Sequence, residues 1–233
     1  TTLPSYSVSI QNGGAAVAGS ALTWDNTNVL CFGADAMIRT DAGEAAASSL
    51  SVGDLVETRD AGLQAIRWIG KRTLTAAELE ENPKLRPIRI RKGALGSGLP
   101  KADLIVSPQH RMLVRSMIAQ KMFGTNEVLV AAKQLCQIDG IDIADDLAEV
   151  EYFHMLFDRH EVVISNGAET ESLYTGPEAL KTVGAAARRE IFALFPELAD
   201  RDFVPSPARV LVPGWMGRRL AARHVRNGKL LVN

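Results

Sequence analysis

The stretch that decides the fold is Cys31-Phe32-Gly33-Ala34-Asp35-Ala36-Met37-Ile38-Arg39-Thr40-Asp41-Ala42-Gly43-Glu44. Within it, residues 37–40 read as a strand and residues 41–44 as a tight turn. A second signal, Ser107-Pro108-Gln109-His110, follows far downstream. The chain therefore places a thiol at the head of a β-rich segment and, later, an imidazole three residues after a hydroxyl.

Further short strands are predicted on both sides of the second signal. Alternating or apolar runs indicate them, and Gly, Pro, Asn and Asp separate them. They lie at 50–58, 64–70, 87–91, 104–106, 112–114, 127–130, 147–157 and 160–164. The turn Asn166-Gly167 closes the last pair as a hairpin. Short strands at this spacing predict an all-β body, shaped like a barrel or a sandwich, with a helical turn or two at 76–82.

Two segments differ in character from the predicted β body at 31–176. Residues 1–30 are small and polar, with a candidate strand at 7–10, and we interpret them as the β-rich end of an N-terminal partner segment. Helical periodicity begins near Pro177, a residue suited to the first turn of a helix. Its apolar positions are Leu180, Val183, Ala187, Ile191, Leu194 and Phe195. With the basic stretch 218–227, residues 177–233 are predicted to form a helical appendage that packs on the β body.

Composition limits the classes of partner. The net charge of −1 predicts no general attraction to nucleic acid or to an anionic membrane. No apolar run reaches the roughly 20 residues that a membrane-spanning helix needs. The two cysteines, Cys31 and Cys136, are too few for a disulfide framework, although one bridge between them stays open as an alternative. Cys136 is the only spare thiol and no Cys-x-x-Cys occurs, so we expect no metal site. No cofactor of another kind is expected.

Cys31, Ser107 and His110 together suit an attack on the chain's own backbone. In an N-to-S acyl shift a thiolate adds to the preceding carbonyl, and the amide nitrogen is protonated and expelled. The thiol must lose its proton, the carbonyl must be polarised, and an acid must reach the nitrogen. The bond at risk would be Leu30–Cys31, with His110 as the acid and Ser107 orienting the bond or binding the oxyanion.

Each of these residues also has a structural interpretation. A lone cysteine such as Cys31 is commonly a small buried hydrophobe, and His110 alone would be a hydrogen-bonded structural histidine. His154 and His160 flank a β segment, so that one would point into the fold and the other to solvent, although a zinc pair is conceivable. His224, among arginines, would lie on a solvated face.

Four stretches, in this order and spacing, resemble the Hint domain of hedgehog autoprocessing domains and inteins. They are Cys31 to Asp60, Arg67-Trp68-Ile69-Gly70, Val106-Ser107-Pro108-Gln109-His110, and a late block of Tyr152-Phe153-His154 and Asp158-Arg159-His160-Glu161-Val162 with Asn166-Gly167. The second and third are similar to the bacterial branch that is often attached to secreted proteins. The resemblance covers about 31–175.

This resemblance implies a pseudo-twofold β horseshoe and an acyl shift at Cys31. His110 matches the histidine of the family's Thr-x-x-His motif, and Ser107 stands where threonine is usual. Asp158 and His160 fall in the late block and join the candidate catalytic residues. A secreted or extracellular location is implied by the resemblance alone.

Splicing is not expected, because Asn166 lacks a preceding His and is followed by Gly167, while nothing follows Asn233 here. The expected substrate is instead the chain's own N-terminal segment, released through a thioester to an unknown acceptor: water, a thiol or an amine. No sterol site is recognisable beyond residue 176. One alternative is a catalytically silent Hint-fold module for binding or display, with Cys31 fully buried. Another is a cysteine hydrolase, which needs an open cleft in front of Cys31.

Overall fold

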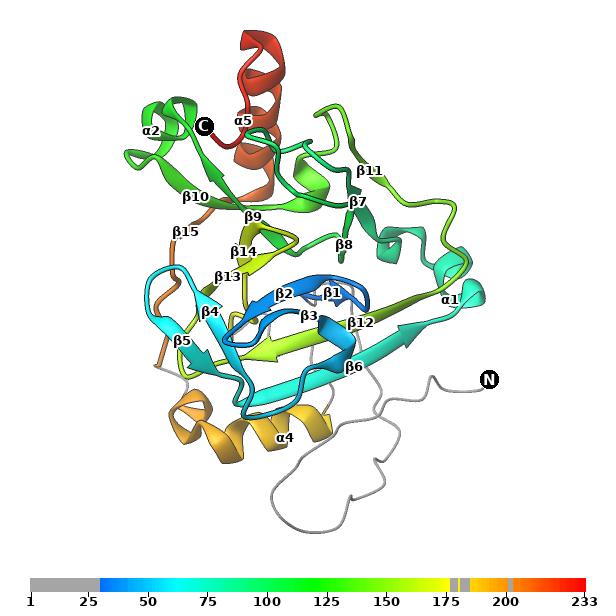
Figure 1. Cartoon of the computed structure of the whole chain (residues 1–233), viewed down its shortest axis with the longest axis vertical. Coiled ribbons are helices and arrows are strands. Elements are labelled where there is room, and N and C mark those ends of the chain that lie inside the picture. Colours follow the sequence, from blue (N-terminus) through cyan, green and yellow to red (C-terminus); the bar gives the residue numbers. More distant parts are fainter. Residues whose placement is uncertain (1–29, 177–179, 181–184, 201–202) are drawn as a thin grey trace.

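The computed structural model describes residues 30–176, 180, 185–200 and 203–233, so the candidate strand at 7–10 lies outside the described residues. Within this part of the chain, short strands form two sheets and helices are few. Figure 1 shows helix α4 beneath the long strands β6 and β12, and helices α2 and α5 at the opposite end of the molecule. The predicted all-β fold with C-terminal helices is confirmed.

The first sheet carries the segment that begins at Cys31. Its order is β11 (Ile141–Ile143), β7 (Ile88–Ile90), β8 (Leu104–Val106), β1 (Phe32–Gly33), β12 (Val150–Leu156) and β6 (Trp68–Leu74). All its neighbours pair antiparallel, and β12 pairs with β6 along the whole length of both strands. The short strand β1 is thus held from both sides, by β8 and by β12.

The second sheet has nine strands within the described residues. Its order is β15 (Val210–Leu211), β10 (Glu127–Ala131), β9 (Arg111–Arg115), β14 (Ala168–Glu171), β13 (Val162–Ser165), β2 (Met37–Thr40), β4 (Leu55–Thr58) and β5 (Gly62–Ala65), and β3 (Gly43–Ala46) pairs with β2. The hairpin β13–β14 turns at Asn166 and Gly167, whose φ angles of 46° and 78° suit the predicted tight turn. The predicted pairing of 147–157 with 160–164 is wrong, because β12 lies in the first sheet and β13 in the second.

Helices occupy the edges of the described structure. They are α1 (Ala76–Glu81), α2 (Met117–Phe123), α4 (Ala185–Leu194) and α5 (Gly214–Asn227), with single 3₁₀ turns at Ala47–Ser49, Pro83–Leu85, Ala132–Gln134 and Pro196–Ala199. Thr75 and Glu78 form a capping box that begins α1 where the sequence predicts a helical turn. Ser116 caps the start of α2, and Gly124 ends it in a left-handed conformation.

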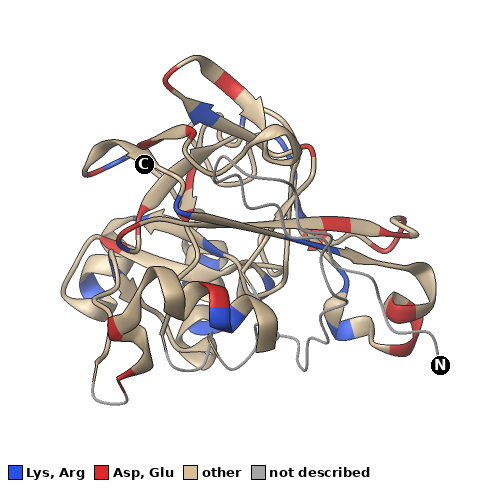
Figure 2. Ribbon diagram, turned by 90° about the horizontal axis from the view of Figure 1, so that it is seen from below, with Lys and Arg blue, Asp and Glu red and all other residues tan. Residues whose placement is uncertain are grey.

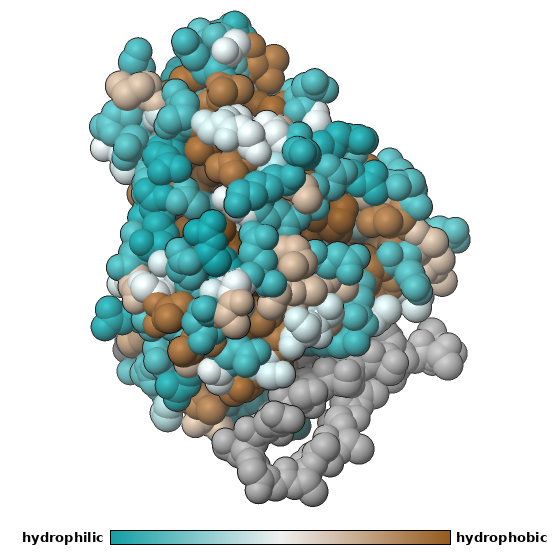
Figure 3. Space-filling view, viewed as in Figure 1, coloured by the Kyte–Doolittle hydropathy of each residue, from teal (hydrophilic) through white to brown (hydrophobic). Residues whose placement is uncertain are grey.

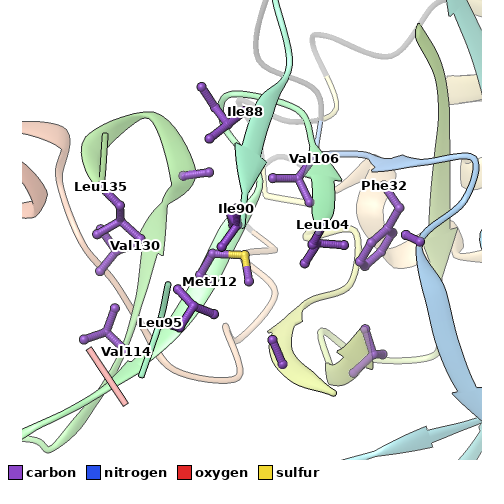
Figure 4. Close-up of a cluster of buried hydrophobic side chains, with 14 of the residues drawn as sticks. Phe32, Ile88, Ile90, Leu95, Leu104, Val106, Met112, Val114, Val130 and Leu135 are labelled. Atoms are coloured by element: carbon purple, nitrogen blue, oxygen red, sulfur yellow. The ribbon is translucent and has the colours of Figure 1, made fainter. Parts of the chain in front are cut away.

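Two large apolar clusters and a small one of Leu113, Leu129 and Val162 hold the described elements together. In the main cluster, Phe32, Ile90 and Leu104 of the first sheet lie near Met112 and Val130 of the second (Figure 4). All five are at most 1 % exposed. Burying each side chain of this size contributes about 1.5–3 kcal/mol. The second cluster lies between α4 and the β6–β12 pair, and it includes Leu30 and Cys31.

Some predicted elements need correction. The alternating run at 64–70 is two strands, because the N–H of Ile66 bonds to Asp54 and that of Arg67 to Leu156. The chain thus passes from the second sheet to the first while the alternation continues. Strand β14 was not predicted, since Ala-Glu-Thr-Glu has little β propensity, and its pairing with β13 and β9 decides its conformation. The prediction that His224 faces solvent is wrong, because its ring is buried against Ser116.

Candidate functional site

The register of β1 brings three distant segments to one point. Phe32 lies opposite Val106 of β8 and also opposite Phe153 of β12. Antiparallel strands run in opposite directions, so the residue that precedes one member of a facing pair lies opposite the residue that follows the other member. The residues that meet beside the start of β1 are therefore Cys31, Ser107 and His154.

Ser107 contacts the backbone of Cys31 in both directions. The N–H of Cys31 donates to the Ser107 hydroxyl oxygen over 2.9 Å, and the N–H of Ser107 donates to the Cys31 carbonyl over 3.0 Å. The N–H of His110 in turn donates to the Ser107 carbonyl over 3.0 Å, which closes the turn between them. The nitrogen of the Leu30–Cys31 peptide bond is therefore held in a fixed orientation.

His154 contacts both atoms that an acyl shift would engage. Its Nδ1 lies 2.7 Å from the carbonyl oxygen of Leu30, and its Nε2 lies 3.3 Å from the sulfur of Cys31. A carbonyl oxygen can only accept a hydrogen bond, so Nδ1 carries the hydrogen. In the neutral ring Nε2 then has a free lone pair and can accept the hydrogen of the thiol.

Burial fixes the charge of this pair. It raises the pKa of the Cys31 thiol, while the hydrogen bond with Ser107 and the nearby Arg72 guanidinium act in the opposite direction. Burial also lowers the pKa of His154 to about 4, although the hydrogen bond with the Leu30 carbonyl favours the charged ring. At neutral pH the proton therefore rests on sulfur, and the imidazole is neutral and able to accept it.

His110 packs against Phe32, and the contacts described for its ring do not include the Leu30–Cys31 junction. The two rings meet edge to face, with centroids 4.4 Å apart, and the Nε2 of His110 lies 2.6 Å from the Thr170 hydroxyl. Its Nδ1 is buried and has no hydrogen-bond partner among the residues that the structure describes. Burial lowers the pKa of His110 to about 4, and the negative charge of Glu171 partly offsets this. The ring is neutral at pH 7 and keeps one nitrogen available.

Asp158 and His160, the other two candidate catalytic residues, lie in different environments. Asp158 is exposed on the surface, where it pairs with Arg67 over 3.0 Å. His160 is buried, its Nδ1 accepts from the N–H of Ala208, and its Nε2 lies 3.3 Å from Glu171. The contacts described for Asp158 and His160 do not include the Leu30–Cys31 junction, and their catalytic roles stay predictions. The interpretation that one of His154 and His160 points to solvent is wrong, since both are buried.

Two residues of this site were not assigned by sequence reasoning. His154 had no role, although its strand, Val150–Leu156, was predicted. Its place in the register beside the start of β1 is a signal that only strand pairing supplies. Thr170 lies in the unpredicted strand β14, opposite Met112 of β9, and so beside the His110 ring.

Helix α4 covers this side of the first sheet. Ala187 and Ile191 are fully buried in the apolar cluster that contains Leu30 and Cys31. Glu190 also accepts a hydrogen bond from the Trp68 indole over 3.1 Å. Figure 2, seen from the side of α4, shows basic and acidic residues interspersed on this face. Helix α4 thus belongs to the same apolar cluster as the Leu30–Cys31 junction.

Three further features were predicted from the sequence and concern the thiols, metal ligands and membrane-spanning helices. Neither Cys31 nor Cys136 forms a disulfide, so the alternative of a bridge between them is wrong. Among the described residues, no group of three His, Cys, Asp or Glu is placed to hold a metal ion. The same residues contain no helix that is both long and apolar enough to cross a membrane.

Fold and site together define a β-rich domain that buries a thiol, two imidazoles and a serine around a peptide bond of its own chain. The family model of the Hint domain matches residues 30–177, and the chain belongs to this family. The Hint and intein-like fold is that of self-processing domains. No curated protein matches the chain.

Several solved structures are similar to it. The gp41-1 intein is 15 % identical, with 60 % of this chain and 97 % of that chain covered and a TM-score of 0.39. The MchDnaB-1 intein is 11 % identical, with 60 % and 98 % covered and a TM-score of 0.39. A bacterial intein-like domain from Clostridium thermocellum is 14 % identical, with 61 % and 97 % covered and a TM-score of 0.39.

Proposed function

We propose that this domain cleaves its own Leu30–Cys31 peptide bond by an N-to-S acyl shift, without splicing. The observation that carries the proposal is the double contact of His154, whose two nitrogens reach the Cys31 sulfur and the Leu30 carbonyl oxygen. One ring can therefore serve the nucleophile and the electrophile of the same step.

The first step moves the thiol proton onto His154. Nε2 takes the proton as the sulfur of Cys31 bonds to the carbonyl carbon of Leu30. The carbonyl oxygen gains negative charge, and the Nδ1–H that already donates to it stabilises the oxyanion. The ring becomes an imidazolium beside that oxyanion, so charge is neutralised within the buried site.

The second step breaks the bond between the Leu30 carbonyl carbon and the Cys31 nitrogen. The nitrogen needs one proton to leave as an amine, and His110 is the acid predicted to supply it through Nδ1. To act as this acid the ring first takes up a second proton from solvent, and its Nε2–H then donates to the Thr170 hydroxyl. The imidazolium of His154 returns the thiol proton to solvent, so the reaction consumes no proton overall. Ser107 holds the N–H of Cys31 and keeps the nitrogen in place during this transfer.

A thioester between Leu30 and the sulfur of Cys31 then remains, and water, a thiol or an amine attacks it. Cyclisation of Asn166 is disfavoured by its hydrogen bonds. Its Oδ1 accepts from Met37 over 2.7 Å, and its Nδ2 donates to the Asp103 carbonyl over 2.8 Å. The amide therefore holds the turn between β13 and β14 instead of serving as a nucleophile.

A second candidate is the catalytically silent module. Cys31 is only 2 % exposed, and burial raises the pKa of its thiol, as that alternative expects. The same burial argues against a hydrolase with an open cleft in front of the cysteine. The self-cleaving domain and the silent module differ in one respect, which is whether His154 accepts the proton of the Cys31 thiol.

The experiment incubates the purified full chain with excess 2-mercaptoethanesulfonate at pH 7 and follows the masses of the products. We expect a fragment that ends at Leu30 as a thioester, and a complementary fragment that begins with Cys31. Cys31→Ala should yield neither, while Cys136→Ala, a matched loss of the other thiol, should behave like the parent chain. If the parent chain stays intact and the Cys31→Ala chain is indistinguishable from it, the domain is the silent module.

A further inference from the structure

Helices α2 and α5 carry basic residues that form no ion pair with an Asp or Glu of the described residues. No Asp or Glu follows Asp202 in the sequence, and none lies between Asp103 and Glu127. These two stretches contain α5 and α2, which pack together through the contact of Ser116 with His224. The basic residues of this pair are Lys121, Arg218, Arg219, Arg223, Arg226 and Lys229.

The arrangement of these cations differs from that of other basic residues in the chain. Arg209, for comparison, pairs with Asp60 and Glu127. Arg218 donates to the uncharged Gln134 amide, and none of the six cations forms an ion pair among the described residues. Arg219 follows Trp215 by one helical turn on the exposed side of α5. Five of the six cations are therefore exposed, Arg223 is half-buried, and no ion pair in the described part of the chain neutralises them.

Apolar side chains are exposed at the same end of the molecule. Met117 of α2 is 64 % exposed, Trp215 and Val225 of α5 are 59 % and 54 % exposed, and Leu230 is 53 % exposed. In Figure 3 this end of the molecule shows hydrophobic and hydrophilic atoms side by side. Exposed tryptophan beside arginine and lysine is typical of helices that lie in the interface of a bilayer.

A hollow of about 400 Å³ lies between the two helices. Lys121 of α2 and Arg223 and Arg226 of α5 line it together with Lys229, and no Asp or Glu side chain contributes to the lining. Four cationic side chains around one hollow suit a negatively charged head group. We call this hollow, with the exposed residues of α2 and α5, the α2–α5 surface.

We propose that the α2–α5 surface docks the domain on a bilayer that contains anionic phospholipid. The net charge of −1 predicts no such attraction, because it averages this surface with an acidic remainder of the chain. The exposed apolar side chains favour a bilayer over nucleic acid, whose interfaces with proteins are more polar. The proposal is independent of the cleavage reaction, since it uses none of the residues at the Leu30–Cys31 junction.

The test measures cosedimentation of the full chain with vesicles of phosphatidylcholine alone and with 30 mol % phosphatidylglycerol at 0.1 M salt. We expect binding to the anionic vesicles only. The double variant Arg219→Glu/Arg226→Glu should bind at least tenfold more weakly, because each cation near an anionic surface contributes about fivefold. The matched control Lys84→Glu/Lys92→Glu makes the same charge change at exposed sites outside the α2–α5 surface and should bind within twofold of the parent chain.

A second measurement covers the case in which the double variant does not fold. Brominated anionic lipid should quench part of the tryptophan fluorescence of the parent chain, and Trp215→Phe should abolish that quenching. Equal binding to both vesicles would overturn the proposal. So would equal loss in the Lys84→Glu/Lys92→Glu control, or stronger binding to a 20-base-pair duplex than to the anionic vesicles at the same salt.

Discussion

The imidazole of His154 bridges the Cys31 thiol and the carbonyl oxygen immediately before it, with contacts of 3.3 Å and 2.7 Å. A residue 123 positions away along the chain thus reaches both sides of the Leu30–Cys31 junction. The geometry requires a hydrogen on Nδ1 and a lone pair on Nε2, which is the tautomer that a base for the thiol needs.

Replacing His154 should therefore stop the acyl shift. His154→Phe keeps a planar ring but removes both contacts, so we expect thiol-induced cleavage to slow at least 100-fold, the lower end of the range for loss of a general base. The rate is read from the appearance of the fragment that ends at Leu30. The matched control is His224→Phe. It removes another buried histidine, which lies in α5 and hydrogen-bonds with Ser116. Cleavage by His154→Phe within threefold of the parent rate would rule out this role.

Acid should destabilise the fold through the buried imidazoles of His110 and His154. The pKa values of His110 and His154 are lowered from 6.5 to about 4. Below pH 6.5 these two rings therefore bind protons in the unfolded chain but stay neutral in the folded chain. The free energy of unfolding should fall by about 2 kcal/mol per ring between pH 7 and pH 5, and continue to fall toward pH 4.

Urea denaturation at pH 7, 6 and 5 measures this dependence. His154→Phe and His110→Phe should each have a shallower slope with pH than the parent chain, because each lacks one of the two rings. A parent chain whose unfolding free energy changes by less than about 0.5 kcal/mol over this range would contradict the buried neutral state of both rings.

The hydroxyl of Thr170 should stabilise the protonated ring of His110. Thr170→Val keeps the side-chain shape but removes the hydroxyl that accepts from Nε2–H of the imidazolium, so the pKa of His110 should fall further. We expect cleavage to slow about tenfold or more, because less of the acid form is present. Thr170→Ser restores the hydroxyl and should recover most of the rate. Nitrogen chemical shifts of His110 followed against pH report its pKa directly, and an unchanged pKa in Thr170→Val would exclude this mechanism.

Helix α4 should control how accessible Cys31 is. Ile191 is fully buried and Leu194 on the same helix is 42 % exposed, so the two positions form a matched pair. Ile191→Asp places a charge in the apolar cluster around the junction and should cost several kcal/mol, which would lift α4 from the sheet. In a Cys136→Ser background we expect iodoacetamide to alkylate Cys31 at least tenfold faster than in the parent, with Leu194→Asp near the parent rate. Equal rates in all three would show that α4 does not cover the thiol.

Local sequence patterns were sufficient for much of the fold and for part of the site. Residues 37–40 and 104–106 alternate or run apolar between turn residues, and each forms a strand where predicted, whereas only 55–58 of the predicted 50–58 does. Ser107 and His110 lie on one turn, so their spacing alone relates them. The predictions failed where tertiary pairing overrides local propensity, as in β14 and in the division of 64–70 into two strands.

What the sequence by itself determined is the list of reactive groups and the β-rich frame, because strand patterns and turn residues act over a few positions. It could not determine which of the four histidines meets Cys31. That is decided by the register of β1 against β12, where a shift of one residue would turn the His154 side chain to the opposite face of the sheet. Burial, which lowers the pKa of the imidazoles and raises that of the thiol, likewise exists only after α4 and both sheets have packed around the junction.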